Sequence, residues 1–435
     1  MFGALHLGLG LTPRIGSRGV RAYVALANLD SGFVFDPIDD FVLVRDAATP
    51  ANNFTGSMAQ AVDRGILVNA SPPTKMLLNS SGILTSGSNL RCQYSAAGVP
   101  LGFLSEPQRT NLQVLSCQFD HANWAKAIAS VTPDVAIAPD GTQTADLWVP
   151  DGTSGDHLIR YGHTVTAATS YTASIFFKPA GLSGTLRWRE DAEDIVGIDI
   201  DLATMEVTSG AEYGGVEPVE NGWYRAWWTG QVVSTTMRPE IRWSSTGNGV
   251  SGVYLWGAQL EAGLFKTSFI KTEGSQVTRN GDNLYVDLTK VPFGAEYTVI
   301  AHAQPSPESA SAAHLLFGVG DNTVNERHQI SNGTPGTGNL GAVWRTSNVL
   351  QASITAAAAA LTPFKAATAT ALNDFEFVAN GLSGGVDNSG NLPIGPTRLQ
   401  IGAGYSNVGS WAAPIGFLAL IPERLSQADM IARTS

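Results

Sequence analysis

From residue 112 to residue 272, short apolar runs follow one another at roughly even spacing, separated by turn residues. The runs at 171–178, 223–229 and 253–260 are rich in aromatic and β-branched residues, which is typical of strands in a packed sheet. We find no helix-period stretch of any length between them. The pattern therefore predicts an antiparallel β-sandwich of the jelly-roll type over residues 107–272.

A second series of strand-like runs begins after a polar connector at 273–279. Its members include 284–288, 297–302 and 415–421, each a short run of large apolar residues. We therefore expect a second antiparallel sandwich over 280–435 and a mainly β protein.

The last element of the chain has the features of a helix. Ser426 and Asp429 have the spacing of an N-terminal capping pair, so residues 427–433 are predicted to form a short terminal helix. The alanine run 356–360 has helix propensity as well. Strand-like runs surround it and Pro363 follows closely, so we do not expect a helix there.

The first hundred residues are patterned differently. Residues 1–30 alternate glycine with large apolar residues, which is typical either of an extended arm that orders against a partner or of a frayed terminus. Residues 31–100 contain short apolar pieces broken by proline turns. We therefore expect 1–106 to be an irregular attachment segment that leans on a neighbour.

Residues 102–112 separate the irregularly patterned first hundred residues from the regular strand-like runs that follow. Pro107 fixes its own φ and favours an extended backbone before it, so the chain is expected to cross between structural units here. Glu106 and Arg109 bracket the proline. They form either a surface ion pair or a buried pair that locks the junction.

The composition of the chain argues against several classes of function and location. Charged residues make up 14% of the chain and the net charge is −11, which argues against a nucleic-acid partner. Cys92 and Cys117 are too few for a disulfide framework, so both are expected to be free thiols. The N-terminus has neither a signal-peptide pattern nor a spanning apolar stretch, so we expect synthesis in the cytoplasm and no membrane insertion.

Motifs for catalysis or cofactors are weak. The seven histidines have no metal-ligand spacing, and no phosphate-binding glycine loop is present. Residues 381–385 match a nucleophile-elbow spacing, but a glycine-rich hairpin explains them better. The acidic run 190–194 is expected to be a solvated turn, and 387–391 lacks the downstream glutamate of a calcium loop. We therefore predict no catalytic residue, no metal and no cofactor.

Aromatic residues are the strongest remaining signal for binding, because sugar rings stack on tryptophan while their hydroxyls bond to planar polar groups such as arginine. Eight of the ten tryptophans lie within 112–272, and most of them must form its core. Trp227 and Trp228 are adjacent on a predicted strand, so one of them should face away from the core. The candidate glycan-binding residues are Arg187, Trp188, Arg189, Arg225, Trp227 and Trp228.

Several of these stretches also resemble a known family. The run Glu-Pro-Gln-Arg-Thr-Asn-Leu at 106–112 is similar to a signature of tailed-phage, prophage and gene-transfer-agent-like spike or fibre proteins, where it precedes a carbohydrate-binding-module-like sandwich. Asn-Gly-Trp-Tyr-Arg at 221–225 and the Trp-Gly-Ala-Gln-Leu-Glu-Ala-Gly series within 254–270 resemble the same domains, with Lys271 in place of their usual proline. The end of the chain, from 395 onward, more loosely resembles concanavalin A-like domains appended to such proteins.

The resemblance implies a virion structural protein, a head-spike or tail-fibre subunit that attaches the particle to host surface polysaccharide. Its expected partners are other virion proteins, bound through residues 1–106, further copies of itself in a homo-oligomer, and the host glycan. Together with the missing signal peptide and the missing catalytic motifs, it leads us to expect a virion location, assembly in the host cytoplasm and no enzymatic activity. Two alternatives remain open: a particle-borne polysaccharide-degrading enzyme, and a purely structural adaptor or decoration protein.

Overall fold

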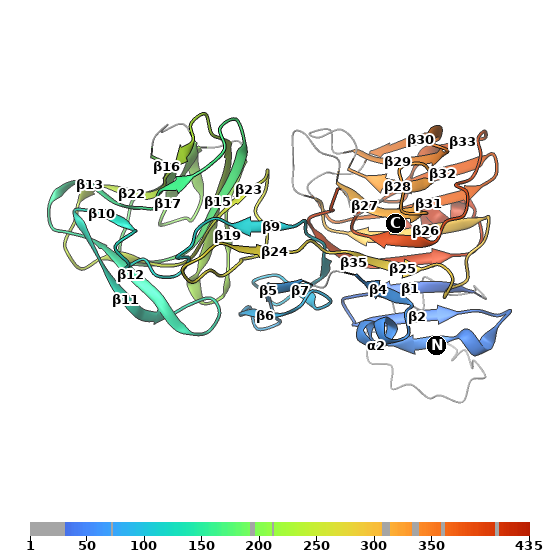
Figure 1. Cartoon of the computed structure of the whole chain (residues 1–435), viewed down its shortest axis with the longest axis horizontal. Helices are drawn as coiled ribbons and strands as arrows, with labels where there is room; N and C mark the ends of the chain where they lie inside the picture. The colour runs from blue at the N-terminus through green and yellow to red at the C-terminus, as the bar shows by residue number, and fades with distance from the viewer. Residues whose placement is uncertain are drawn as a thin grey trace, which may run out of the picture.

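The computed structural model describes residues 31–70, 73–191, 196–210, 213–306, 314–332, 339–357, 362–404 and 409–435. It contains two β-sandwich lobes that lie side by side (Figure 1). The first lobe comprises residues 109–279, and the second combines residues 31–104 with residues 280–435. The predicted mainly β fold, with antiparallel sheets and a short C-terminal helix, is confirmed.

Two six-stranded sheets form the first lobe. Sheet 1 has the order β10 (Ala125–Ala127), β13 (Ser154–Arg160), β22 (Pro239–Thr246), β16 (Thr185–Glu190), β17 (Gly197–Asp201) and β18 (Val207–Gly210). Sheet 2 has the order β11 (Ala129–Ile137), β12 (Gln143–Pro150), β23 (Gly252–Ala262), β15 (Ser170–Ala180), β20 (Tyr224–Gln231) and β19 (Gly214–Pro218). Alternation is clear in β16, where Leu186 and Trp188 are buried while Arg187 and Arg189 lie on the outer face.

Two larger sheets form the second lobe. Sheet 3 has the order β3 (Phe54–Gly56), β2 (Phe41–Arg45), β1 (Gly32–Asp36), β35 (Pro414–Ile421), β26 (Tyr297–Ala303), β31 (Phe364–Ala371), β32 (Asp374–Ala379) and β33 (Leu382–Asp387), with β8 (Pro100–Leu104) pairing β35 and β7 (Cys92–Tyr94). Sheet 4 has the order β30 (Val349–Ala357), β29 (Asn339–Thr346), β28 (Arg327–Ser331), β27 (Leu315–Gly320), β34 (Arg398–Ile401), β25 (Leu284–Asp287) and β4 (Leu67–Asn69).

The remaining elements are short. Three two-stranded ladders pair β5 (Thr74–Leu78) with β6 (Leu84–Ser88), β9 (Arg109–Asn111) with β24 (Val277–Arg279), and β14 (His163–Thr164) with β21 (Thr236–Met237). The helical elements are η1 (Pro50–Asn52), α2 (Met58–Asp63), η2 (Glu220–Gly222) and α3 (Gln427–Thr434). Neither of the described α-helices has the length and apolar character that crossing a bilayer requires.

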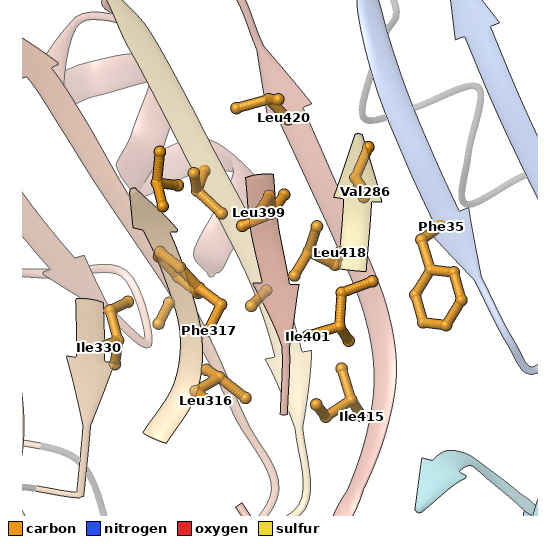
Figure 2. Close-up of a cluster of buried hydrophobic side chains, with 14 of the residues drawn as sticks. Phe35, Val286, Leu316, Phe317, Ile330, Leu399, Ile401, Ile415, Leu418 and Leu420 are labelled. Carbon is orange, nitrogen blue, oxygen red and sulfur yellow. The ribbon is translucent and has the colours of Figure 1, made fainter. Parts of the chain in front are cut away.

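Residues 31–104 differ from the expected irregular segment, because their strands belong to both sheets of the second lobe. Phe33 and Phe35 of β1 are fully buried and share the core of the C-terminal strands, where β1 pairs with β35 (Figure 2). On the other sheet, β4 pairs with β25. Strands β1 and β4 thus find hydrogen-bond partners more than two hundred residues away, which periodicity alone does not reveal. Residues 1–30, expected to form an arm or a frayed end, lie outside the described residues.

The terminal helix is confirmed, with Ser426 at its N-cap accepting the backbone N–H of Asp429. Met430 of this helix is fully buried among small residues on the outer face of sheet 3, including Ala367 and Ala419. The small side chains allow the helix to approach the sheet closely. Of the alanine run 356–360, Ala356 and Ala357 end strand β30, and the rest lies outside the described residues.

The first lobe is inserted into the second. The chain leaves the second lobe after β8, enters the first through β9 and returns through β24, so that the antiparallel β9–β24 ladder joins the lobes (Figure 1). The hairpin β5–β6 lies beside this ladder, and Leu84 packs with Phe176 and Trp256 of the first lobe. The crossings lie next to residues 107 and 280, where the sequence predicted boundaries.

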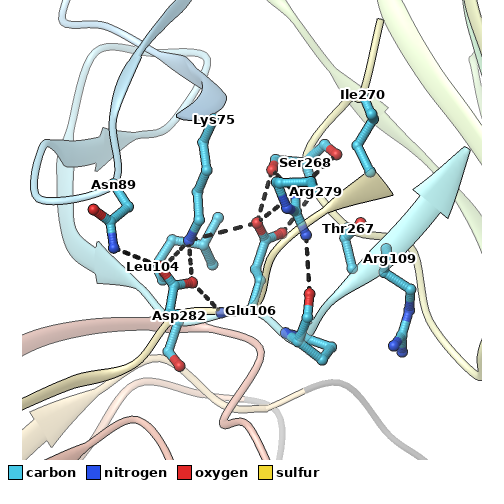
Figure 3. Close-up of polar contacts among 12 residues, drawn as sticks. Lys75, Asn89, Leu104, Glu106, Arg109, Thr267, Ser268, Ile270, Arg279 and Asp282 are labelled. Atoms are coloured by element: carbon cyan, nitrogen blue, oxygen red, sulfur yellow. Dashed lines mark hydrogen bonds and ion pairs between the residues drawn. The ribbon is translucent and has the colours of Figure 1, made fainter. Parts of the chain in front are cut away.

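Four buried charges occupy the base of the ladder (Figure 3). Glu106 is 4% exposed and pairs with Arg279 at 3.0 Å and with Lys75 at 3.6 Å. Lys75 also forms an ion pair with Asp282, whose carboxylate accepts the backbone N–H of Glu106 at 2.7 Å. Neither the surface pair nor the buried pair between Glu106 and Arg109 forms. Glu106 is buried, but its partners are Arg279 and Lys75. Arg109 instead lies 3.6 Å from Glu261.

Acid is expected to weaken this junction through Glu106. Burial by itself raises the pKa of this carboxyl, but Arg279, Lys75 and two hydrogen bonds from Ser268 outweigh burial and hold its pKa at about 2. A depressed pKa contributes stability above the unfolded-state value, and this contribution is lost as the pH falls from about 4.5 toward about 2. Urea denaturation should therefore show a smaller stability loss between pH 5 and pH 2.5 in Glu106→Gln than in the wild type. Parallel pH profiles would contradict the assignment.

Candidate functional site

The six predicted site residues fall in three different places in the first lobe. Trp188 and Trp228 lie between its two sheets, Arg187 and Arg189 lie on the outer face of sheet 1, and Arg225 and Trp227 lie on the outer face of sheet 2. The two outer faces are on opposite sides of the sandwich (Figure 1). The structure therefore does not bring the six residues together into one surface.

Trp188 and Trp228 are core residues. They are 2% and 0% exposed, and their ring centroids lie 6.3 Å apart across the sandwich. Large aromatic side chains of this kind supply much of the apolar area that two facing sheets bury. Neither ring can contact a ligand while the sandwich is intact.

On the outer face of sheet 2, Arg225 is covered as well. It is 5% exposed, donates to Ser174 Oγ at 2.9 Å and lies over the ring of Phe176, 5.1 Å from its centroid. Burial lowers the pKa of this guanidinium, and Glu217 and Glu261 oppose that effect. Arg225 therefore supports the segment that covers this face and has little access to solvent.

Trp227 is the adjacent tryptophan that faces away from the core, as the strand pattern predicts. Its half-buried ring lies against Gly215 of β19, where an added Cβ would come within 2.8 Å of the ring. Lys266 Nζ lies 4.7 Å from the ring centroid and forms an ion pair with Glu217 at 2.8 Å. A sugar could stack on Trp227 only after Lys266 moves.

The outer face of sheet 1 is open and strongly polar, and we name it the arginine face. It gathers Arg160 of β13, Arg187 and Arg189 of β16, Asp199 of β17, Glu240 and Arg242 of β22, and the adjoining Asp191 and Arg238. The strand registers place these residues side by side: Arg187 is opposite both Asp199 and Arg242, and Glu240 is opposite Arg189. Alternation in four neighbouring strands of the sheet thus produces one array of planar groups.

Ion pairs hold this array in place. Arg189 pairs with Asp199 at 2.7 Å, and Arg242 pairs with Glu240 at 2.5 Å. Burial raises the pKa of Glu240, while Arg242 and Arg160 oppose the increase. Arg187 and Arg238 are the most exposed of these arginines, each with a side chain that is 41% exposed, but Arg187 is farther from a carboxylate, at 3.9 Å from Asp199 against 3.4 Å between Arg238 and Asp191. Arg187 is therefore the guanidinium best placed to donate to a ligand on this face.

The residues of this face that were not predicted come from other strands. Arg160, Asp199, Glu240 and Arg242 each lie in a run with clear alternation, which is the signal that assigns them to an outer face. The alternation alone does not say which strands are neighbours. The register between β16 and β22 is needed to place Arg242 beside Arg187.

The weaker motifs have structural explanations. Glu190 is 1% exposed and accepts the backbone N–H of Arg238, and Asp191 pairs with Arg238 at 3.4 Å, so these two residues are not the solvated turn expected for the acidic run. The rest of that run lies outside the described residues. The glycine-rich hairpin at 381–385 is confirmed by the pairing of β32 with β33. Both cysteines are free thiols, and in the described ranges no three His, Cys, Asp or Glu residues come close enough to hold a metal ion.

Comparison with protein-family models and with curated proteins finds no match. Solved structures with some likeness include the carbohydrate-binding module CBM40 of the Ruminococcus gnavus IT-sialidase bound to α2,3-sialyllactose, at 17% identity over 34% of this chain and 86% of that one, with a TM-score of 0.28. A second is the CBM22 tandem of Paenibacillus barcinonensis Xyn10C, at 10% identity over 74% of this chain and 99% of that one, with a TM-score of 0.23. A third is the SAP-like pentraxin of Limulus polyphemus, at 14% identity over 32% and 70% of the two chains, with a TM-score of 0.25.

Proposed function

We propose that this chain is a glycan-binding structural subunit of a phage or phage-derived particle, a head spike or tail fibre that attaches the particle to host surface polysaccharide. The observation that carries the glycan-binding part is the arginine face, a flat array of planar donors and acceptors on an open sheet with Arg187 still accessible. Sugar hydroxyls are recognised by such planar groups. The particle assignment follows from the resemblance of residues 106–112 and 221–279 to phage spike and fibre proteins.

In this proposal the chain binds other virion proteins through residues 1–106 and forms a homo-oligomer. A shallow, open face provides few contacts per copy, so each contact is weak. Many copies on one particle raise the overall avidity without any new contact. The chain acts by binding and does not cleave its glycan.

The proposal predicts that Arg187→Ala weakens glycan binding by about tenfold, since a lost charged hydrogen bond is worth about 1.5–3 kcal/mol. The measurement is titration of the purified chain with host surface polysaccharide. Stability should change by less than about 1 kcal/mol, because Arg187 is exposed and 3.9 Å from its carboxylate.

Lys178→Ala provides the matched control, because it removes one positive charge from sheet 2, on the other side of the lobe. Equal binding by both variants and the wild type would overturn the role of the arginine face. Shortening of the polysaccharide during the titration would instead favour the degrading enzyme. Particles that lack this chain but adsorb normally would favour a structural adaptor.

A further inference from the structure

Lys75 is the one lysine that is buried in the described part of the chain, at 1% exposure. It belongs to β5, and its Nζ is in direct contact with Asp282 Oδ2 at the base of the β9–β24 ladder (Figure 3). Both side chains are shielded from solvent. Such a pair carries a large desolvation cost, because two charges leave water.

The residue types in this contact suit a reaction as well as an ion pair. Arginine is the usual cation of buried ion pairs, because its guanidinium is weakly hydrated and always charged. Lysine differs, since it can lose a proton in a buried site, and its neutral amine is a nucleophile. A carboxylic acid held against such an amine can be converted into an amide.

Both carboxylate oxygens of Asp282 are held by hydrogen-bond donors. The buried Asn89 donates an Nδ2 hydrogen to Oδ1 at 2.7 Å, and the backbone N–H of Glu106 donates to Oδ2 at 2.7 Å. Donors fixed on a carbonyl oxygen stabilise the negative charge that develops there when a nucleophile attacks the carbon. Asn89 has the position of such a donor for Oδ1.

A second carboxylate lies within reach of the lysine. Glu106 Oε2 is 3.6 Å from Lys75 Nζ and 3.0 Å from Arg279. The ion pair with Arg279 and two hydrogen bonds from Ser268 hold this carboxylate in place in its ionised form. An ionised carboxylate beside a reacting nitrogen can accept its proton and pass it on.

We propose that Lys75 and Asp282 join in an intramolecular isopeptide bond, which the chain forms by itself with Glu106 as the proton carrier. A proton first passes from Nζ to Oδ2, which gives a neutral amine and a carboxylic acid. Nζ then attacks Cγ, and the electron pair of the C=O bond moves to Oδ1, beside Asn89. Glu106 takes a second proton from Nζ and gives it to the Oδ2 hydroxyl, which leaves as water. One C–N bond forms and one C–O bond breaks, with no oxidant, reductant or cofactor.

The bond has a consequence for the junction between the lobes. It replaces two buried charges with a neutral amide, while Arg279 remains the ion-pair partner of Glu106. It also links β5 to the chain just after β24, across 207 positions, so the whole first lobe lies inside a covalent loop. A cross-link of this kind restricts the unfolded chain and clamps the base of the β9–β24 ladder.

The test is mass spectrometry of the purified, denatured full chain. We expect an intact mass below the sequence mass by one water molecule, and a branched tryptic peptide in which Lys75 is joined to Asp282. Lys75→Arg keeps the positive charge but lacks the primary amine, so it should restore the full mass. Asp282→Asn should give the same cross-link with loss of ammonia in place of water, since nitrogen is then the leaving group.

Lys271→Arg is the matched control. Lys271 also pairs with a carboxylate, Glu273 at 2.8 Å, but this pair is exposed, so the variant should still lose one water molecule. Glu106→Gln keeps the shape of its side chain and removes the proton acceptor. The cross-linked fraction, followed over time after refolding, should therefore rise about a hundredfold more slowly.

A wild-type mass equal to the sequence mass would overturn the proposal and leave the cluster as a buried ion pair. Loss of water that persists in Lys75→Arg would also overturn it, because the reaction would then lie elsewhere, as in a cyclised aspartate at Asp140 or Asp151, each followed by glycine. Cross-linking at the wild-type rate in Glu106→Gln would contradict the role of Glu106 as proton carrier.

Discussion

Replacing Glu106 by alanine should lower the free energy of unfolding by about 3–5 kcal/mol, the usual result of removing one partner from a buried ion pair. The change leaves Arg279 and Lys75 buried without the carboxylate that lies 3.0 Å and 3.6 Å from them. It also removes the acceptor of the backbone N–H and the hydroxyl of Ser268. Urea denaturation followed by tryptophan fluorescence would measure the loss, since the first lobe carries most of the tryptophans.

Glu273→Ala is the matched control for that experiment. Glu273 belongs to an ion pair too, at 2.8 Å from Lys271, but its side chain is 64% exposed. Exposed pairs contribute about 0–1 kcal/mol, so this variant should remain close to the wild type. Similar losses in both variants would mean that the buried cluster at the base of the β9–β24 ladder does not stabilise the junction.

The second large effect is expected at adjacent tryptophans. Trp228→Ala should destabilise the first lobe by about 3–5 kcal/mol, the range for removing a large buried aromatic side chain. Trp228 is fully buried and packs against Trp188. Thermal unfolding followed by circular dichroism would measure the change.

Trp227→Ala supplies the comparison within the same dipeptide. Its ring is half-buried on the outer face, where it contacts Lys266, so its loss should cost about 1–2 kcal/mol. Equal losses of stability at the two positions would contradict the assignment of Trp228 to the buried face and Trp227 to the outer face of strand β20. A drop in glycan affinity in Trp227→Ala alone would add the outer face of sheet 2 to the binding surface.

Strand periodicity predicts only part of the candidate site. Alternation in 185–190 correctly places Arg187 and Arg189 on one face and Trp188 on the other. It cannot show that Arg225, on an outer position of its strand, is covered and only 5% exposed. It also cannot show that Arg242 of β22 lies beside Arg187, because the two residues are more than fifty positions apart in the sequence and are brought together only by the sheet register.

The mainly β class, the capped terminal helix and the alternation of buried and outer residues in 185–190 follow from the sequence, because these depend on local propensity and on a period of two. The tertiary structure alone decided that β1 and β4 complete the second lobe, that the first lobe is inserted between its parts, and that Lys75 meets Asp282 across 207 positions. Strand pairing and buried ion pairs of this kind depend on the burial and hydrogen bonding of the whole folded chain. A short segment of sequence does not contain that information.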